Sequence, residues 1–364
     1  MLSGKVRKLF GRLKGFLSYS CRASRDRRRL APYYGDLWAR GRMPTGGAVK
    51  FYRLSEYIPN SPRSFNLAYI GSNTLPTNWQ EFLWALRLRK VSLVYNQNGV
   101  YYPGWYGPGW GRKNGPLRTF LHEADHVFYQ SEFCKTSCDT FLGRREGSSE
   151  ILYNAVDTDV FRPSLRTRED RPVTLLLAGT QYQDYPVSNA VQTLSEVNRL
   201  GLDARLLIGG KLSWAGSQED SSRELFEWCK AQGVSDKVEL LGAYSQAEVM
   251  FVHASADILI QAKYNDPCPS GLIEALACGV PVVYSKSGGS PELVGDEAGI
   301  GVDVEHQWEK MLVPEPTEMA NAVLRVANEI EVYSESARAR AVSRFDLKHW
   351  VRRHVEVFES LLKN

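Results

Sequence analysis

The sequence predicts an α/β protein built from two βαβ halves with a cleft between them. The first observation is that short apolar runs alternate with helix-length segments; clear runs cover residues 65–71, 91–95, 173–178 and 204–209. This alternation is typical of parallel strands joined by right-handed crossovers. The second is the length of 364 residues, which accommodates two domains that each have a core. The third is one stretch, residues 256–285, that has the pattern strand, loop, helix, strand.

The other predicted elements continue the alternation. In the first half we expect helices over 79–88 and 132–142 and strands over 124–130 and 149–154. In the second half we expect a helix near 187–200 and strands over 238–241, 257–260 and 281–284. Residues 346–362 have the apolar spacing of an amphipathic helix.

Composition excludes several classes of protein. With 43% hydrophobic and 24% charged residues, the chain is a globular rather than a disordered one. No apolar run approaches the roughly 18 residues that span a bilayer. Six cysteines are scattered without zinc spacing, and Cys134 and Cys138, one helical turn apart, are interpreted as core side chains rather than a redox pair. We therefore expect a reduced, cytoplasmic protein.

Positive charge is concentrated at the start of the chain. Residues 1–29 contain ten Lys or Arg and one acid, a net charge of +9, so the rest of the chain carries −5 of the total +4. This distribution argues against a nucleic-acid-binding surface over the whole protein. Apolar residues recur at helical spacing in the same segment: Leu2, Val6, Leu9, Phe10, Leu13, Phe16 and Leu17. A basic amphipathic helix of this kind is predicted to lie on an anionic membrane surface, peripheral on the inner membrane face; the alternative is a solvated or docked helix.

The stretch from Asp266 to Val283 is the strongest candidate site. Prolines 267 and 269 favour an extended loop after the strand at 256–262. Ser270 is a plausible N-cap for a helix over 271–278, and Gly279 provides a left-handed stop before a strand at 281–285. Ligands of open α/β sheets bind at the carboxyl ends of strands, and helix N-termini attract anions. Two carboxylates, Asp266 and Glu274, are thus predicted beside a site for a phosphorylated ligand.

The first half offers two weaker signals. Gly46 and Gly47 precede a predicted helix and allow close backbone approach to an anion, although such a pair is often just a turn. After residue 95 comes a predicted loop rich in aromatic residues and glycine, with Tyr101 and Trp105 followed by Arg112. Aromatic faces with nearby cations are common in sugar sites. The alternative is a loop that its own packing orders.

Taken together, these segments resemble the group 1 glycosyltransferases, the retaining family-4 enzymes with two Rossmann-like domains in the GT-B arrangement. The resemblance covers roughly residues 43–362, and its most specific motif is the pair of acids separated by seven residues, Asp266 and Glu274. Four other segments contribute: Gly46-Gly47, residues 124–133, residues 154–161 and residues 287–294.

The resemblance implies transfer of a sugar from a nucleotide-diphosphate sugar to a glycan or lipid-linked acceptor, with retention, without a metal and without another cofactor. Asp266 and Glu274 would be the catalytic carboxylates, Asp266 facing the donor sugar and Glu274 binding the ribose hydroxyls. The donor site would comprise Gly46, Gly47, Lys211, Lys263, Ser270, Gly271, Leu272 and Glu274. The acceptor side would comprise Asn98, Tyr101, Trp105 and Arg112.

The implied domains are a basic amphipathic segment over 1–30, an acceptor domain over 31–165 and a donor domain over 166–345. Residues 346–364 would form a helix that packs back toward the N-terminal domain.

Three departures from the family pattern bear on activity. Asp266 replaces the usual Glu. The segment 179–186 lacks the usual Arg and Lys that hold the diphosphate, and Lys211 and Lys263 are the favoured substitutes among nearby cations that include Lys50 and Arg112. Residues 96–98 stand where a His often lies. Apart from these three, no first strand is evident before Gly46, so the N-terminal sheet is expected to be one strand short.

The missing cations leave two hypotheses from different classes. One is an active glycosyltransferase at the cytoplasmic membrane face. The other is a catalytically weak GT-B module that binds nucleotide or sugar, or serves assembly, at the membrane surface. A nucleotide-sugar epimerase on the same fold lacks specific support.

Overall fold

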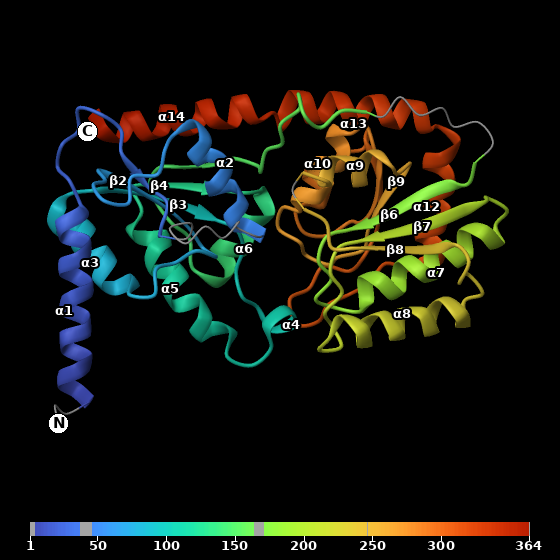
Figure 1. The fold of residues 1–364 in the computed structure, drawn as a ribbon, viewed down its shortest axis with the longest axis horizontal. Coiled ribbons are helices and arrows are strands. Elements are labelled where there is room, and N and C mark those ends of the chain that lie inside the picture. Colours follow the sequence, from blue (N-terminus) through green and yellow to red (C-terminus); the bar gives the residue numbers. More distant parts are fainter. Residues whose placement is uncertain (1–3, 37–45, 164–170, 246, 364) are drawn as a thin grey trace. The chain divides into compact units, whose positions relative to one another are not determined.

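The computed structural model describes residues 4–36, 46–163, 171–245 and 247–363 (Figure 1). The chain forms two compact units. Unit 1 comprises Met1–Tyr153 and Lys348–Asn364, and unit 2 comprises Asn154–Leu347. The first crossing between units therefore lies at Tyr153 rather than near residue 165, and the N-terminal segment belongs to unit 1 instead of standing alone.

Unit 1 contains a five-stranded parallel sheet in the order β1-β2-β3-β4-β5. Its strands are β1 (Pro32–Tyr33), β2 (Leu67–Gly71), β3 (Ser92–Gln97), β4 (His126–Tyr129) and β5 (Ser149–Ile151). Its helices are α1 (Gly4–Arg22), η1 (Gly46–Ala48), α2 (Val49–Tyr57), α3 (Trp79–Arg89), α4 (Pro103–Tyr106), α5 (Trp110–Glu123), α6 (Glu132–Phe141) and α14 (Leu347–Lys363).

Two expectations for unit 1 were wrong. A first strand does precede Gly46: β1 pairs with β2, but its two residues are too short to show a period. The predicted aromatic loop contains α4 and the first turn of α5, a helix whose glycines and Pro116 obscure the helical pattern. In addition, β3 continues beyond its predicted end at Tyr95, through Asn96 and Gln97.

The core of unit 1 is aromatic. Tyr69 of β2 is fully buried, and its ring lies against those of Phe51, Phe128 and Phe358. Its hydroxyl oxygen lies 2.9 Å from Nε2 of His354 and accepts a hydrogen bond from the Asn96 side-chain amide at 3.0 Å. The C-terminal helix α14 thus completes this core, and the hydrogen bonds give the buried hydroxyl its partners.

Helix α1 packs along α3. The Phe16 ring stacks on Trp84 with ring centroids 4.1 Å apart, and Arg12 forms an ion pair with Glu81. Several large apolar side chains of this pair of helices remain exposed, namely Phe10, Leu13, Leu17, Trp84 and Leu88. The helix is therefore docked on one side only. None of the helices in the described residues is long and apolar enough to cross a membrane.

Unit 2 contains a six-stranded parallel sheet in the order β11-β10-β9-β6-β7-β8. Its strands are β6 (Val173–Ala178), β7 (Ala204–Gly209), β8 (Val238–Gly242), β9 (Ile258–Gln261), β10 (Val282–Ser285) and β11 (Gly299–Val302). Its helices are α7 (Tyr185–Arg199), α8 (Gln218–Ala231), α9 (Val249–Ala254), α10 (Ser270–Ala277), α11 (Ser290–Val294), α12 (Pro316–Asn328) and α13 (Ile330–Arg344).

Helices cover both faces of this sheet. Helix α7 contacts α8 and α12 in one layer, while α10 contacts α9, α11 and α13 in another (Figure 1). The core between the sheet and the α7 layer is almost wholly aliphatic; it includes Leu175, Val191, Leu206 and Ile258. Such runs are what a sheet buried on both faces requires, and β6 and β7 have the predicted limits.

Candidate functional site

The loop that leads from β9 into α10 places Asp266 at the carboxyl edge of the unit 2 sheet. The Asp266 carboxylate accepts the N–H of Cys268 at 3.3 Å, and its carbonyl accepts that of Gly289 at 2.8 Å. Gly288 has φ +64°, and a Cβ there would lie 2.4 Å from the Asp266 carbonyl oxygen. A glycine is therefore required for the loop to close around the acid.

Asp266 is electrostatically coupled to Lys263. Burial raises the pKa of Asp266, while the Lys263 charge opposes that rise. Burial likewise lowers the pKa of Lys263, and Asp266 opposes that shift. The Lys263 ammonium lies 3.4 Å from the carbonyl oxygen of Thr180, in the segment that lacks basic residues. The side chain thus brings positive charge to that segment from another strand.

Lys211 borders the same segment through its backbone. Its carbonyl accepts the N–H of Gln181 at 2.8 Å, and its side chain is exposed. The preceding Gly210 has φ +118°, and a Cβ there would lie 2.3 Å from the carbonyl oxygen of Gly179. The turns after β6 and β7 therefore meet closely, with Lys211 and Lys263 at their margins.

Helix α10 begins one residue earlier than predicted. Pro269 is the N-cap and no side chain caps the helix, so Ser270 is its first residue rather than its cap. The first amides of a helix lack partners within it, so those of Ser270 and Gly271 can donate to an anion. Leu272 does not share this role: its side chain is fully buried, and its N–H donates to the Pro269 carbonyl at 3.1 Å.

Asn154 adds a contact that the sequence did not assign. Its side-chain amide donates to the Cys268 carbonyl at 3.1 Å and approaches the Ser270 hydroxyl at 3.3 Å. The start of α10 is thereby held to the segment that opens unit 2. The Asn154–Phe161 segment carried part of the resemblance, but nothing in its pattern indicated this contact.

Glu274 lies in the second turn of α10 with its side chain 12% exposed. Its Oε2 is 3.7 Å from Nε2 of the buried His253, on α9. Burial, followed by the Glu274 charge, raises the pKa of Tyr244, whose hydroxyl accepts the N–H of Gly179 at 3.1 Å. The sequence reasoning missed His253 and Tyr244, because neither stands at a motif spacing.

The predicted residues of unit 1 form a separate polar edge. A Cβ at Gly47 would lie 2.3 Å from the Asn73 side-chain amide and 3.0 Å from that of Asn98. The Lys50 ammonium donates to the side-chain carbonyls of Asn96 at 2.9 Å and Asn98 at 3.2 Å. The structure thus brings Gly47 and Asn98 together, around a buried lysine.

The aromatic segment after β3 is organised largely by its own packing. Tyr101 stacks on Trp105 at 5.3 Å between ring centroids, and its backbone is paired in both directions with the Asn114 side chain. Trp105 remains 50% exposed. Arg112 lies exposed on α5, and in the described part of the chain no contact joins it to Asn98.

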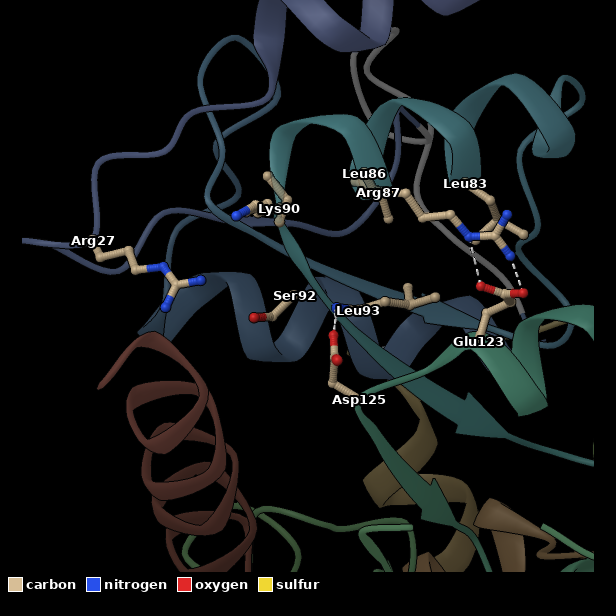
Figure 2. Close-up of a pocket in the computed structure, with 10 residues that line it drawn as sticks. Arg27, Leu83, Leu86, Arg87, Lys90, Ser92, Leu93, Glu123 and Asp125 are labelled. Carbon is tan, nitrogen blue, oxygen red and sulfur yellow. Dashed lines mark hydrogen bonds and ion pairs between the residues drawn. The ribbon is translucent and has the colours of Figure 1, made fainter. Parts of the chain in front are cut away.

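A cavity of about 280 Å³ lies at the amino ends of the unit 1 strands, where β3 begins. Figure 2 shows Arg27 and Lys90 on one side of it and the Arg87–Glu123 ion pair on the other. Asp125 accepts the N–H of Leu93 at 2.7 Å in its wall. Because ligands of parallel sheets bind at the carboxyl ends of strands, this cavity is distinct from the candidate site.

Comparison with known proteins points to one family. Residues 157–313 match the model described as "Glycosyl transferases group 1". The chain is 24% identical to a subunit of the phosphatidylinositol N-acetylglucosaminyltransferase of Arabidopsis thaliana, over 70% of this chain and 52% of that protein. It is 26% identical to the D-inositol 3-phosphate glycosyltransferase of Mycolicibacterium smegmatis, over 48% of this chain and 41% of that protein. The chain thus spans about half, or less, of these curated relatives.

Solved structures show the same fold. HepE of Anabaena, solved in complex with UDP, superposes with a TM-score of 0.67 at 17% identity, covering 95% of this chain and 96% of that one. Sucrose-phosphate synthase from Thermosynechococcus elongatus gives a TM-score of 0.67 at 16% identity, covering 87% and 78%. Both likenesses concern the fold, which is the parallel α/β fold of GT-B glycosyltransferases. Together these findings support the group 1 glycosyltransferase family for this chain, through a matched segment that lies within unit 2.

Proposed function

We propose that the protein is a glycosyltransferase that uses a nucleotide-diphosphate sugar as donor. The observation that carries this proposal is the convergence, at one sheet edge within the family-matched segment, of Asp266, Glu274, Lys263 and the uncapped start of α10. A ribose diol needs a hydrogen-bond acceptor, and a diphosphate needs hydrogen-bond donors and positive charge. The donor sugar needs a polar side chain to which its hydroxyls can hydrogen-bond.

Each group has a chemical role in this proposal. Glu274 accepts hydrogen bonds from the ribose hydroxyls, while the amides of Ser270 and Gly271 donate to the diphosphate. Lys263 supplies the positive charge that stabilises the departing diphosphate, in place of the basic residues absent from 179–186, and no metal is needed. Asp266 faces the donor sugar. Lys211 is the second candidate cation, because it borders the same turn.

The transfer itself is proposed to retain configuration at the anomeric carbon. The bond between that carbon and the phosphate oxygen breaks, and its electron pair leaves with the diphosphate. The acceptor hydroxyl oxygen then bonds the carbon from the same face, and its proton passes to the departing phosphate oxygen. No protein base is required, which accords with Asn96–Asn98 at the position where the family often carries a His.

The acceptor is proposed to be a glycan or a lipid-linked sugar, in the cytoplasm. Several relatives are named for inositol phosphate or phosphatidylinositol substrates, including a GDP-mannose-dependent mannosyltransferase of Mycolicibacterium smegmatis that is 30% identical over 51% of each chain. HepE structures contain UDP and UDP-glucose. On the acceptor side we propose Asn98, Tyr101, Trp105 and Arg112, of which the exposed Trp105 ring is the best-supported contact.

The exposed apolar side chains of α1 and α3 support peripheral membrane attachment. Phe10, Leu13 and Leu17 recur at helical spacing and are exposed. Helix α1 contacts α3 through the Phe16–Trp84 stack, and Trp84 of α3 is itself exposed. Basic residues dominate the same stretch of sequence. An anionic bilayer matches both the apolar area and the positive charge.

Liposome sedimentation tests the attachment. Full-length protein should partition onto vesicles containing anionic lipid, and a variant with Phe10, Leu13 and Leu17 all changed to Ser should not. Val332→Ser, which alters an exposed apolar residue of α13, is the matched control. Equal partitioning of the triple variant and wild type would overturn membrane attachment. Concentration-dependent dimerisation that the triple variant abolishes would assign this surface to a second copy instead.

A donor panel tests the enzymatic proposal. Purified protein is incubated with UDP- and GDP-sugars and extracted lipid acceptors, with EDTA in parallel, and both sugar transfer and donor hydrolysis are followed. The proposal expects turnover that survives EDTA and a product with the anomeric configuration of the donor. Tight nucleotide binding without turnover on any donor would favour the alternative, a catalytically weak binding or assembly module. Inhibition by EDTA would contradict metal independence.

A further inference from the structure

His253 is a deeply buried histidine near the candidate donor site. It projects from α9, and its side chain is only 1% exposed. Within the described residues neither ring nitrogen has a hydrogen-bond partner. Buried polar atoms normally have partners, so a buried imidazole without one needs an explanation.

The imidazole lies beneath the start of α10. A Cβ at Gly271 would be 4.0 Å from Cε1 of His253, and the Glu274 carboxylate oxygen is 3.7 Å from Nε2. His253 therefore lies against the face of the first two turns of α10 that carries Gly271 and Glu274. The 3.7 Å separation is longer than a hydrogen bond, but such bonds are often long before a ligand binds and shorten in the complex.

Two neighbouring side chains, Tyr244 and Cys278, also respond to the Glu274 charge. Tyr244 has a pKa raised by burial and by the Glu274 charge. Cys278, one turn further along α10, has a pKa raised to about 12 by burial and then by Glu274, while Arg338 on α13 opposes that shift. Glu274 thus provides the carboxylate nearest the described His253 ring, 3.7 Å from its Nε2.

We propose that His253 is a positioning residue for Glu274. The imidazole donates from Nε2 to one carboxylate oxygen, which fixes the rotamer and leaves the other oxygen directed at the ribose hydroxyls of the nucleotide. This inference rests on the proposed function, since it concerns the same site. It predicts that His253 contributes to recognition of the ribose and not to binding of the diphosphate.

Nucleotide titration with a ribose-dependent readout tests the role. The Kd values of UDP and GDP are compared with those of their 2′-deoxy counterparts in wild type, His253→Phe and His253→Gln. In wild type the ribonucleotide should bind about tenfold more tightly, as expected for loss of one charge-assisted hydrogen bond. His253→Phe should bring that ratio close to one, with a smaller loss of affinity for the deoxynucleotide, which keeps its 3′-hydroxyl. His253→Gln, whose amide can still donate to Glu274, should retain most of the ratio.

The outcomes separate the two proposals. A uniform loss of affinity for both nucleotides in His253→Phe would show a merely structural role, as would a preserved ratio, and either would overturn this inference alone. Absence of nucleoside diphosphate binding by the wild-type protein would overturn the proposed function and this inference with it. Thermal unfolding of each variant, followed by circular dichroism, shows whether His253→Phe is folded. If it is not, the ratio of Kd values in His253→Gln decides: a ratio near the wild-type value supports the inference, and a ratio close to one overturns it.

Discussion

The two units build the same kind of parallel sheet around different side chains. In unit 1 the core is made of aromatic rings in edge-to-face and tilted contact, and Tyr69 and His354 bring polar atoms into it that need hydrogen bonds. In unit 2 the core is aliphatic, with residues such as Leu206 that carry no polar side-chain atoms. An aromatic core gains area per residue but has polar groups to satisfy, whereas an aliphatic core is stabilised by burial and packing alone.

The same contrast extends to the carboxyl edges of the sheets. In unit 1 the buried Lys50 is held by the neutral amides of Asn96 and Asn98. In unit 2 Lys263 faces a carboxylate, Asp266, and a loop carbonyl at 3.4 Å. The first edge joins a lysine to two amide side chains, and the second keeps opposite charges near a helix start. Under the proposed function, unit 2 would supply the groups that bind the charged part of a donor.

The largest effect is expected from a cavity in the aliphatic core. Leu206→Ala should lower the free energy of unfolding of unit 2 by about 2–5 kcal/mol, because the lost burial is compounded by the void left behind. The stacked Trp214 and Trp228 report on unit 2 in urea unfolding followed by fluorescence. Leu200→Ala, at a 38% exposed residue, is the control and should cost under about 0.5 kcal/mol. A cost of that small size for Leu206→Ala would contradict the aliphatic-core account.

The charged edge is tested by Lys263→Met. We expect donor turnover to fall about 100-fold, because one charged donor to the departing diphosphate is lost. Lys263→Arg should retain much of the activity. Lys50→Met, the matched change at the carboxyl edge of the unit 1 sheet, should instead act mainly through the stability of unit 1. If Lys50→Met and Lys263→Met reduced turnover equally in folded protein, the contrast between the two edges would not hold.

A smaller effect is expected from a polar atom in the aromatic core. Tyr69→Phe should cost about 1–3 kcal/mol of unfolding free energy, because it leaves the buried Asn96 amide and His354 without their common partner. Chemical denaturation monitored by circular dichroism measures the loss. Tyr57→Phe, at an exposed tyrosine, serves as the control. Equal stability of Tyr69→Phe and wild type would show that the hydroxyl is unnecessary there.

The mildest test uses pH. Burial lowers the pKa of His354 from 6.5 to about 3, so the folded protein keeps this side chain neutral while the unfolded chain binds a proton. The contribution of neutral His354 to the free energy of unfolding is therefore complete above pH 6.5 and is lost as the pH falls from 6.5 toward 3. Well below pH 6.5 the loss is about 1.4 kcal/mol per pH unit. His354→Gln should remove about 1.6 kcal/mol of the change in unfolding free energy between pH 6.5 and 5, measured by urea unfolding. Identical pH dependence in the two proteins would refute the assignment.

The contrast between cores also explains how much the sequence could predict. Strands β6 and β7 were predicted with their full limits, because aliphatic runs between loops have few alternative readings. Strand β3 was predicted to end at Tyr95, because Asn96 and Gln97 are polar, although both are buried within the strand. Their burial depends on partners from β2, α2 and the following loop, which only the fold brings together.

The candidate site likewise contains residues that the sequence pattern indicated and others that only the fold brings together. Asp266 and Glu274 were proposed from a spacing, and Lys263 from its position after a strand. His253 and Tyr244 could not be found, because their relation to Glu274 arises from the packing of α9 and of the turn after β8 against α10. Ser270 was predicted as a cap because serine is common there, whereas Pro269 occupies that position and leaves the helix start open.

Calorimetric titration of UDP and GDP into wild type and Glu274→Ala tests the central claim most directly. Glu227→Ala, which removes an exposed carboxylate of α8, is the matched control. We predict that the wild type and Glu227→Ala bind at least one of the two nucleotides with the same affinity, and that Glu274→Ala binds it about 10- to 100-fold more weakly, in keeping with loss of hydrogen bonds to a charged group. Unchanged affinity in a folded Glu274→Ala protein would contradict the claim.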